Sequence, residues 1–423
     1  MRILILGSGG RECTLAWKIS QSPKCESLWI APGNAGTSSY GTNVPVNPED
    51  KDGIIELIRR HRIDVVVVGP EAPLVDGLVD DLHGVPEFRD VIVVGPGKMG
   101  AMLEGSKAFA KEFMFKYDIP TAQYLEVTAG NLQEGLNFID RQQVPIVLKA
   151  DGLAAGKGVL ILEEREEAKA ELKAMLGGKF GQASTKVVIE DFLSGIEFSV
   201  FVLTDGREYV LLPEAKDYKR IGEGDTGLNT GGMGAVSPVP FMDATLKSKV
   251  IQRIIEPTIA GIRQEAMDYH GFIFFGLINV GGDPYVIEYN CRLGDPETEV
   301  ILPRLKNDLV DLFEAMHSGR LNKQHIEIDL RSATTVMLVA GGYPGSYRKG
   351  DILTGLDQVQ GSLLLHAGTK MADGQTVTNG GRVLAVTSLG EDKQLALAQS
   401  YAAIRKIQFA DMYYRRDIGF DLD

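Results

Sequence analysis

The sequence between residues 148 and 159 reads LKADGLAAGKGV, and this stretch says most about the fold. It predicts a strand that carries Lys149 near its end, a loop of small residues with three glycines, and a second strand over Val159–Leu162. No helix is expected after the glycines, so the stretch differs from the P-loop pattern G-x-x-x-x-G-K-[ST]. Such a hairpin can lie over the phosphates of a nucleotide, with its lysines as point charges. The alternative is a flexible surface hairpin.

Upstream of this hairpin, the first hundred residues alternate between strand and helix patterns. Continuous β-branched runs predict strands buried on both faces of a parallel sheet, at Ile3–Leu6, Leu28–Ala31, Asp64–Val68 and Val91–Val94. Between them we expect one helix capped by Asn47 with Pro48 in its first turn, and another with a stripe formed by Leu74, Leu78 and Leu82. The alternation predicts a Rossmann-like unit whose ligands lie at the carboxyl ends of the strands.

The loop Gly7-Ser8-Gly9-Gly10 follows the first strand and precedes a helix. Its backbone N–H groups could hold a phosphate with help from the helix dipole. The spacing is not G-x-G-x-x-G, and no acidic residue closes the second strand, where Ala31-Pro32-Gly33 stands instead. A phosphate site, a nicotinamide or flavin fold and a plain tight turn therefore all remain open at this point.

Downstream, about Gly105–Asn322 mixes helix and strand patterns. Strands are expected at Val144–Ala150, Val187–Glu190 and Ile196–Leu203, and an antiparallel pair at Phe272–Val280 and Tyr285–Tyr289. The last hundred residues predict short strands and one helix near Glu391–Ile407. The fold class is α/β, with a Rossmann-like N-terminal domain, central α+β domains and a small β-rich C-terminal domain. We place the domains at residues 1–104, 105–328 and 329–423, with a lid subdomain at about 121–192.

Three further stretches carry polar groups suited to chemistry. On a strand, Glu288, Asn290 and Arg292 would project from one face, where two oxygen ligands suit Mg²⁺ and an arginine can clamp phosphoryl oxygens. Glu190–Leu193, followed by Glu197, could line an adenine and its ribose. The segment from Pro213 to Gly234 is long, polar and rich in glycine, which favours a substrate loop. The alternatives are a surface strand with a salt bridge and a solvated acidic turn.

Composition limits the classes of function. Lys plus Arg number 44 and Asp plus Glu 57 in 423 residues, which gives a formal net charge of −13. This argues against a general nucleic-acid binder, which needs a cationic surface to displace counterions. Glycine, with 49 residues, exceeds its usual share of ~7%. Many of the glycines gather at strand ends and in the loops named above, which favours close approach of the backbone to a ligand over flexible linkers.

Cys13, Cys25 and Cys291 are too few and too far apart for a disulfide framework, which favours a reducing compartment. The apolar run Ile3–Leu6 is too short for a signal-peptide core, and no stretch approaches the ~20 apolar residues of a membrane span. We therefore expect a cytoplasmic protein without membrane contact. None of the six histidines has metal-ligand spacing, so they are interpreted as structural.

Together these motifs resemble an ATP-grasp ligase, and more narrowly the glycinamide ribonucleotide synthetase (phosphoribosylamine–glycine ligase) family. The resemblance extends over essentially the full chain, and its motifs are Gly69–Val75, Lys149–Val159, Lys219-Arg220, Asn229–Pro238, Asn290–Thr298, His366–Lys370 and Asn379–Val383. It implies that ATP, glycine and 5-phosphoribosylamine give ADP, phosphate and glycinamide ribonucleotide through a glycyl phosphate, in the second step of de novo purine synthesis. The instability of phosphoribosylamine would favour transient contact with the enzyme that supplies it.

The resemblance also implies roles for individual residues. Arg292 and Lys149 would act on the transferring phosphate, and Mg²⁺ or Mn²⁺ would be held by Glu288 and Asn290. ATP would be bound by Lys107, Lys149, Gly152, Gly156, Lys157, Gly158, Glu190, Phe192, Leu193 and Glu197. The other substrates would be bound by Gly9, Gly10, Asn34, Gly36, Lys216, Asp217, Thr230, Gly231, Gly232 and Arg292.

Two departures from the family pattern stand out. The family usually reads Gly-Gly-Arg-Glu-His where this chain has Cys13, and a neutral thiol cannot replace an imidazole. Many ATP-grasp enzymes also carry an acidic metal ligand on the strand before Glu288, near the place of Leu277. Another ATP-grasp ligase or carboxylase of purine metabolism is the alternative. A nicotinamide oxidoreductase would leave Glu288, Asn290 and Arg292 unexplained.

Overall fold

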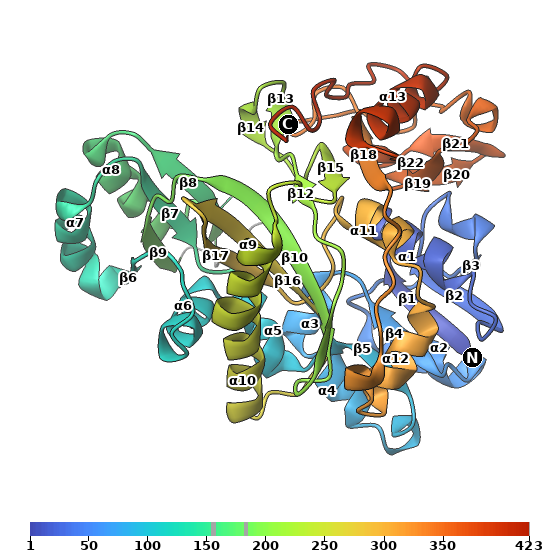
Figure 1. Ribbon diagram of the computed structural model, residues 1–423, viewed down its shortest axis with the longest axis horizontal. Helices are drawn as coiled ribbons and strands as arrows, with labels where there is room; N and C mark the ends of the chain where they lie inside the picture. The colour runs from blue at the N-terminus through green and yellow to red at the C-terminus, as the bar shows by residue number, and fades with distance from the viewer. Residues whose placement is uncertain (154–157, 182–184, 423) are drawn as a thin grey trace.

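The computed structural model describes residues 1–153, 158–181 and 185–422. Figure 1 shows a Rossmann-like N-terminal unit, a long central sheet, a small sheet that projects to one side, and a β-rich C-terminal unit beside the first. The predicted α/β class is confirmed. The predicted ATP-binding residues Gly156 and Lys157 lie outside the described residues.

Parallel strands form the Rossmann-like unit. In chain order they are β1 (Arg2–Gly7), β2 (Ser27–Pro32), β3 (Thr42–Asn43), β4 (Val65–Val68) and β5 (Ile92–Pro96), and they lie side by side as β5-β4-β1-β2-β3. The helices are α1 (Gly10–Ile19), α2 (Lys51–His61), α3 (Glu71–Asp76), α4 (Leu78–His83) and α5 (Lys98–Gly105). All four valines of β4 are buried, as the β-branched run predicts for a strand covered on both faces.

Two helix predictions in this unit need correction. The helix α2 is capped by Asp50, whose Oδ1 accepts the N–H of Gly53 at 3.0 Å, and not by Asn47. Asn47 instead accepts the N–H of Glu49 and so closes a turn before the helix. The leucine stripe is not one helix, because Gly77 adopts a φ of 90° and separates α3 from α4.

The central strands extend the parallel sheet without a break. The strand β16 (Tyr269–Val280) pairs antiparallel with β5 through Tyr269 and His270. It also pairs with β10 (Ile196–Thr204) and with β17 (Asp283–Asn290), and β11 (Tyr209–Leu211) lies at the far edge. The helices of this region are α6 (Lys107–Lys116), α9 (Ala244–Val250), α10 (Glu256–Gln264), α11 (Thr298–Arg304) and α12 (Leu309–His317). The N-terminal and central regions therefore share one sheet.

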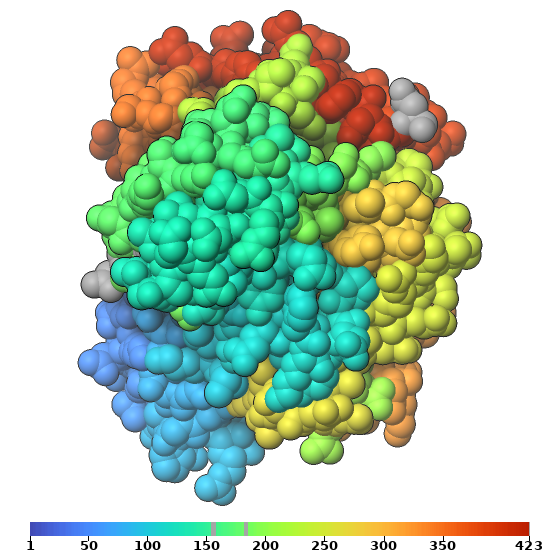
Figure 2. Space-filling model, turned by 90° about the vertical axis from the view of Figure 1, so that its left-hand side faces the viewer, coloured from blue at the N-terminus to red at the C-terminus, as the bar shows by residue number. Residues whose placement is uncertain are grey.

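The projecting sheet has its own hydrophobic core. Its strands β6 (Tyr124–Thr128), β9 (Lys186–Asp191), β7 (Ile146–Ala150) and β8 (Val159–Leu162) are neighbours in that order, with α7 (Leu132–Arg141) and α8 (Arg165–Leu176) packed on it. Figure 2 shows this unit standing in front of the rest of the molecule. The predicted hairpin is present, with Lys149 opposite Val159.

The C-terminal unit is built on a third sheet. Its strands, in spatial order, are β12 (Lys216–Asp217), β15 (Gly234–Ser237), β18 (Ser332–Val339), β22 (Arg382–Gly390) and β19 (Leu363–His366), with α13 (Lys393–Ile404) against it. Two hairpins complete it: β13 (Arg220–Gly222) with β14 (Thr226–Asn229), and β20 (Thr369–Ala372) with β21 (Gln375–Thr378). The segment Gly222–Gly234 is thus partly a hairpin and not one long irregular loop.

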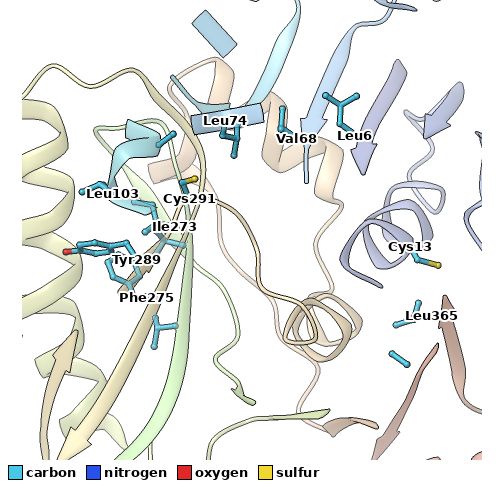
Figure 3. Packing of buried hydrophobic residues seen from close by; sticks show 14 of the residues in the cluster. Leu6, Cys13, Val68, Leu74, Leu103, Ile273, Phe275, Tyr289, Cys291 and Leu365 are labelled. Carbon is cyan, nitrogen blue, oxygen red and sulfur yellow. The ribbon is translucent and has the colours of Figure 1, made fainter. Parts of the chain in front are cut away.

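One hydrophobic cluster joins the N-terminal, central and C-terminal units. It contains Leu6 of β1, Phe275 of β16 and Leu365 of β19, all fully buried. Figure 3 shows Cys13 of α1 near Leu365 of β19, and Cys291 beyond the end of β17 near Leu103 of α5. The core is therefore continuous across the boundaries between the N-terminal, central and C-terminal regions.

Candidate active site

Two buried lysines share one buried carboxylate at the inner end of the small sheet. Lys149 Nζ lies 2.9 Å from Glu190 Oε2, and Lys111 Nζ lies 3.2 Å from the same oxygen. All three residues are at most 5% exposed. Burial lowers the pKa of Lys111 to about 8, although the negative charge of Glu190 favours the protonated form of the lysine. Two cations against one carboxylate leave a net positive charge that can attract phosphate oxygens.

Glu190 is predicted to contact adenine, and one of its two carboxylate oxygens is left for that contact. One carboxylate oxygen faces the two lysines, and the other, Oε1, is buried without a hydrogen-bond partner. Just beyond it the chain turns outward, and Phe192 is 41% exposed and Ile196 39% exposed. These apolar side chains offer a surface for a base, while Glu190 fixes the position of Lys149.

The start of α6 is tied to the glycine hairpin. Asp151 accepts hydrogen bonds from Ser106 Oγ at 2.9 Å and from the N–H of Ala108 at 2.8 Å. Lys107 Nζ donates to the carbonyl of Gly152 at 3.2 Å. Burial lowers the pKa of Lys107, and the nearby charge of Lys149 lowers it further, while Glu288 opposes the shift. The structure therefore brings Lys107, Lys149 and Glu288 together.

Glu288 and Asn290 lie at the end of β17, where a metal ligand pair was predicted. Asn290 is 7% exposed, and its side-chain nitrogen has no hydrogen-bond partner. Because an amide can present either its nitrogen or its oxygen, this unsatisfied group fits a site that receives a cation or its water. Glu288 faces the charges of Lys107, Lys219 and Asp217. The described residues contain no group of three or more His, Cys, Asp and Glu able to hold a metal ion.

Leu277 lies on the strand that pairs with β17, next to the residue opposite Glu288. Gly276 pairs with Glu288, and a bulge follows, so that Leu277 pairs with Val286 and is fully buried. The sequence of β16, YHGFIFFGLINV, contains no acidic residue. A second carboxylate ligand therefore does not come from this strand.

Arg292 lies just beyond β17, between two carboxylates. Its Nη2 donates to Glu104 Oε1 at 2.7 Å, and its Nε is 3.4 Å from Glu71 Oε2. Burial lowers the pKa of Arg292, but Glu104 and Glu71 outweigh this, so the pKa is raised. Glu104 also accepts from the N–H of Cys291 at 2.8 Å. The guanidinium is thus held in place by side chains from α5 and α3, with its Nε buried and lacking a hydrogen bond.

A second charged group lies at the start of β10 and consists of Glu197, Asp217 and Lys219. Lys219 Nζ lies 2.7 Å from Glu197 Oε2 and 3.7 Å from Asp217 Oδ1. Burial lowers the pKa of Lys219, but Asp217 and Glu197 raise it well above its ordinary value. Burial raises the pKa of Asp217, and Lys219 opposes the shift. Lys219 therefore joins the proposed ribose residue Glu197 to the substrate segment.

Lys216 is held by the C-terminal segment. Its Nζ lies 3.2 Å from Asp421 Oδ2 and 4.3 Å from the ring centroid of Tyr218. Tyr218 is buried and donates its hydroxyl to Asp421 Oδ1 at 2.7 Å. Arg415 approaches the same ring at 5.3 Å and is fully buried. The last residues of the chain thus belong to the surroundings of the predicted substrate loop.

The first glycine loop has two backbone donors that are already used. The N–H of Gly9 donates to Glu12 Oε2 at 2.6 Å, and the N–H of Arg11 donates to Asp295 Oδ2 at 3.0 Å. Asn34 Nδ2 donates to the carbonyls of Ser8 and His366, at 2.9 and 2.7 Å. The start of α1 is therefore capped by carboxylates of the protein itself, which leaves fewer donors for a phosphate than the sequence suggests.

Gly231 and Gly232 are fastened to the C-terminal unit by Arg382. The guanidinium donates to the carbonyl of Gly231 at 2.6 Å and to that of Asp295 at 2.7 Å. Gly232 adopts a φ of 117°, and a side chain there would collide with Pro296. Thr230 Oγ1 donates to the carbonyl of Lys219 at 2.8 Å. The predicted residues Thr230, Gly231 and Gly232 thus lie where the C-terminal unit meets the segment after β17.

Comparison with known proteins shows to which family the chain belongs. The sequence matches the phosphoribosylglycinamide synthetase N domain over residues 1–104, the ATP-grasp (A) domain over 105–298 and the C domain over 333–421. The chain belongs to the phosphoribosylglycinamide synthetase family. The resemblance seen in the sequence is thereby confirmed.

Relatives in this family match over nearly the full length. The chain is 45% identical to the phosphoribosylamine–glycine ligase of Vibrio parahaemolyticus, covering 99% of this chain and 98% of that protein. The ligase of Escherichia coli strain K12 gives the same figures. The crystal structure of the Thermotoga maritima ligase is 38% identical, covers 99% of this chain and 100% of that one, and has a TM-score of 0.86.

More distant structures share the fold. The biotin carboxylase of Campylobacter jejuni is 13% identical with a TM-score of 0.73, and an N5-carboxyaminoimidazole ribonucleotide synthetase is 17% identical with a TM-score of 0.65. These likenesses extend over 95% or more of the chain. In the part of the chain that the structure describes, no helix is long and apolar enough to cross a membrane.

Sequence reasoning did not assign several buried charged residues of this synthetase-family site. Lys111 lies on the buried face of α6, and Glu104 meets Arg292 across 188 positions of sequence. Asp295, Glu299 and Arg382 also meet only in the folded chain. The motif Asn290–Thr298 includes Asp295, and Asn379–Val383 includes Arg382, so the charged residue inside each motif was the signal that the sequence offered.

Proposed function

We propose that this protein ligates glycine to 5-phosphoribosylamine with ATP, giving glycinamide ribonucleotide, ADP and phosphate. The observation that carries the proposal is the match of all three synthetase domains in order along one chain, with Lys107, Lys149 and Glu288 gathered at the glycine hairpin. This is the second step of de novo purine synthesis, and the cytoplasm is the proposed location.

ATP would lie between the small sheet and the end of β17. Lys107, Lys149, Gly152 and Gly158 would contact its phosphates, as would Gly156 and Lys157, which lie outside the described residues. The adenine would be bound by Glu190 and by the backbone near Phe192 and Leu193, and Glu190 would also orient Lys149. Glu197, whose Oε2 lies 2.7 Å from Lys219 Nζ, would accept hydrogen bonds from the ribose hydroxyls.

Glu288 and the amide of Asn290 would hold Mg²⁺ or Mn²⁺. An oxygen pair beside phosphates suits such an ion, whose remaining positions are filled by phosphate oxygens and water. When bound, the ion would neutralise charge on the phosphates. Lys107 and Lys149 would add two cations on the opposite side, so little negative charge would remain unbalanced at the γ-phosphate.

The reaction would proceed in two steps. The glycine carboxylate would attack the γ-phosphate and release ADP, which gives glycyl phosphate. The amine of phosphoribosylamine would then attack the glycyl carbonyl and release phosphate. Arg292 would bind oxygens of the transferring phosphate, because its buried Nε has no hydrogen-bond partner and its orientation is fixed by Glu104 and Glu71. Positioning and charge neutralisation suffice for such a transfer, so no side-chain nucleophile is needed.

Glycine and phosphoribosylamine would lie between the first glycine loop and the substrate segment. The proposed contacts are Gly9, Gly10, Asn34, Gly36, Lys216, Asp217, Thr230, Gly231, Gly232 and Arg292. Glu12 and Asp295 already accept hydrogen bonds from the N–H groups of Gly9 and Arg11. The loop therefore keeps few donors for a phosphate, and its carbonyls would suit the sugar hydroxyls of phosphoribosylamine. Transient contact with the enzyme that supplies phosphoribosylamine would protect this unstable amine.

We divide the chain into residues 1–104, 105–328 and 329–423, with a lid at about 121–192. The separate core of the small sheet supports the lid as a unit able to move over ATP. Closure of such a lid would keep water from the acyl phosphate. The continuous sheet supports the view that the first two divisions move together.

The deciding experiment measures ADP release by the purified protein. Release should require glycine, phosphoribosylamine and Mg²⁺ together, and glycinamide ribonucleotide should form in equal amount. The alternative, another ATP-grasp ligase or carboxylase of purine metabolism, would release ADP with a different acid. Comparable turnover with bicarbonate in place of glycine would defeat the proposal.

A further inference from the structure

Glu299, in the first turn of α11, is a fully buried carboxyl group without a hydrogen-bond donor on either oxygen among the described residues. It lies against α1, and any side chain at Gly10 would collide with its Oε1. Burying an ionised carboxylate without donors is strongly unfavourable, so such a group takes up a proton instead. Accordingly, burial and the neighbouring Asp295 raise the pKa of Glu299 well above its ordinary value.

Asp295 is the natural acceptor of that proton. Both carboxyl groups border Gly10, where a Cβ would lie 2.2 Å from Glu299 Oε1 and 3.5 Å from Asp295 Oδ2. Burial raises the pKa of Asp295, but Arg382 and Arg11 outweigh this, so the pKa is lowered. Asp295 Oδ1 lies 2.9 Å from Arg382 Nη2, and its Oδ2 accepts the N–H of Arg11. One member of the pair is thus held ionised by cations, while the other has none of its own.

Cys13 adds no positive charge beside Glu299. It faces the same junction, is fully buried, and lies close to the backbone of His366. Burial raises the pKa of Cys13 to about 12, and Glu299 adds to the shift, so the thiol is neutral. Figure 3 shows Cys13 on the side of α1 that faces the C-terminal unit. The neutral thiol can neither take the proton of Glu299 nor balance a negative charge on it.

We propose that Glu299 is a positioning residue that keeps its proton at neutral pH and donates it to Asp295, so that this acid–carboxylate pair fixes the Gly9–Arg11 loop against the substrate. The inference rests on the proposed function in one respect, namely that this loop borders the phosphoribosylamine site. The protonation of Glu299 itself does not depend on which substrate binds.

The charges around Glu299 come from each element packed on α11. The helix α1 contributes Arg11, Glu12 and Cys13, and β22 contributes Arg382. The strands β15 and β18 contribute no ionisable group. Asp295 and Glu297 precede the helix, and both add negative potential at Glu299. A negative charge on Glu299 would be repelled by Asp295 and Glu297, and with Glu12 the two arginines would then face four carboxyl groups.

The first test needs no activity. Infrared spectroscopy of the intact protein at pH 7.5 should show the carbonyl stretch of a protonated carboxylic acid that is missing from the Glu299→Gln variant. Glutamine has nearly the same shape and keeps a donor, so this variant should fold. Identical acid bands in both proteins would show that Glu299 is ionised and would overturn the proposal.

The second test separates the hydrogen bond from the charge. Glu299→Gln keeps a donor to Asp295 and should leave KM for phosphoribosylamine within about twofold of wild type. Glu299→Leu has no donor and should raise that KM by about tenfold or more, as loss of one hydrogen bond to a charged group implies, with KM for ATP unchanged. Equal KM values for all three proteins, or equal rises in both KM values for the leucine variant, would contradict a positioning role.

A third variant changes Cys13, the neighbour of Glu299. In Cys13→His an imidazole could take the proton of Glu299, so the acid band should weaken and KM for phosphoribosylamine should change. In the double variant with Glu299→Gln this additional change should disappear, and Cys13→Ser serves as the small neutral control. Additive effects of the two substitutions would refute the coupling. If the wild type released no ADP with glycine, the proposed function would fail while the infrared result would still stand.

Discussion

Arg415 offers a quantitative test of how the end of the chain supports the site. It is fully buried, and its Nε and Nη2 donate to the two oxygens of Asp417, both at 2.8 Å. Its Nη1 donates to Asp225 at 2.6 Å and to the carbonyl of Arg220 at 3.1 Å. Burial lowers the pKa of Arg415, but its bonds to Asp417 and Asp225 outweigh this. The pKa is therefore raised. The perturbation is Arg415→Met, which keeps the apolar stem and removes every donor.

The magnitude follows from the burial of the partners. Breaking a fully buried ion pair by removing one partner costs about 3–5 kcal/mol. Here the side chain of Asp417 is 20% exposed and that of Asp225 is 41% exposed, so water can partly replace the lost bonds. We therefore expect a loss of about 2–3 kcal/mol in the free energy of unfolding. Arg415→Lys should lose part of this, because an ammonium cannot form the bidentate contact with Asp417.

Thermal unfolding by circular dichroism measures the effect, and Arg416→Met is the matched control. Arg416 is the exposed neighbour of Arg415, and it should tolerate the change. Because the hairpin Arg220–Asn229 precedes Thr230, kcat should also fall in Arg415→Met. Equal melting temperatures for the two methionine variants would refute the reasoning, since the buried ion pair would then contribute nothing.

Three further predictions concern other parts of the molecule. Glu288→Gln should lower kcat by about a hundredfold or more with an unchanged melting temperature, because a metal ligand loses its charge; near-normal turnover would remove Glu288 from the site. The pKa of Lys111 is lowered to about 8, so the folded protein loses that proton before the unfolded chain does. Its stability should rise from about pH 8 to pH 10.5 relative to Lys111→Met, as followed by melting temperature, and parallel curves would contradict the shift. Gly36→Ala should lower the melting temperature by several degrees, since its Cβ would lie 2.5 Å from the ring of His366, whereas Gly130→Ala meets its nearest atom at 3.6 Å; equal effects would argue against the close contact.

The sheets of this fold could be predicted because their strands carry strong local signals. The valines of β4 and the hairpin from Lys149 to Val159 are set by residues that neighbour one another in sequence. The helix ends were less predictable, since Asp50 and Asn47 are both good caps and only the folded chain selects between them. The register beside Glu288 depended on a bulge that no residue pattern announces.

The site was predictable in its residue types but not in its pairings. Lys149 and Glu190 stood out in sequence, yet the ion pair between these residues, 41 positions apart, could not be predicted from it. Glu299 gave no signal, because a glutamate in the first turn of a helix is ordinary until its burial is known. Buried charge is a property of packing between distant segments, so the sequence alone did not reveal it.

The antiparallel contact between β5 and β16 has a consequence for dividing the gene. A fragment ending at residue 104 would expose the backbone edge of β5, where Tyr269 and His270 pair in the whole protein. Unprotected edges recruit strands from other chains, so we expect such a fragment to precipitate on expression. The small sheet closes on its own core, and it is the segment best suited to exchange between relatives as a chimera.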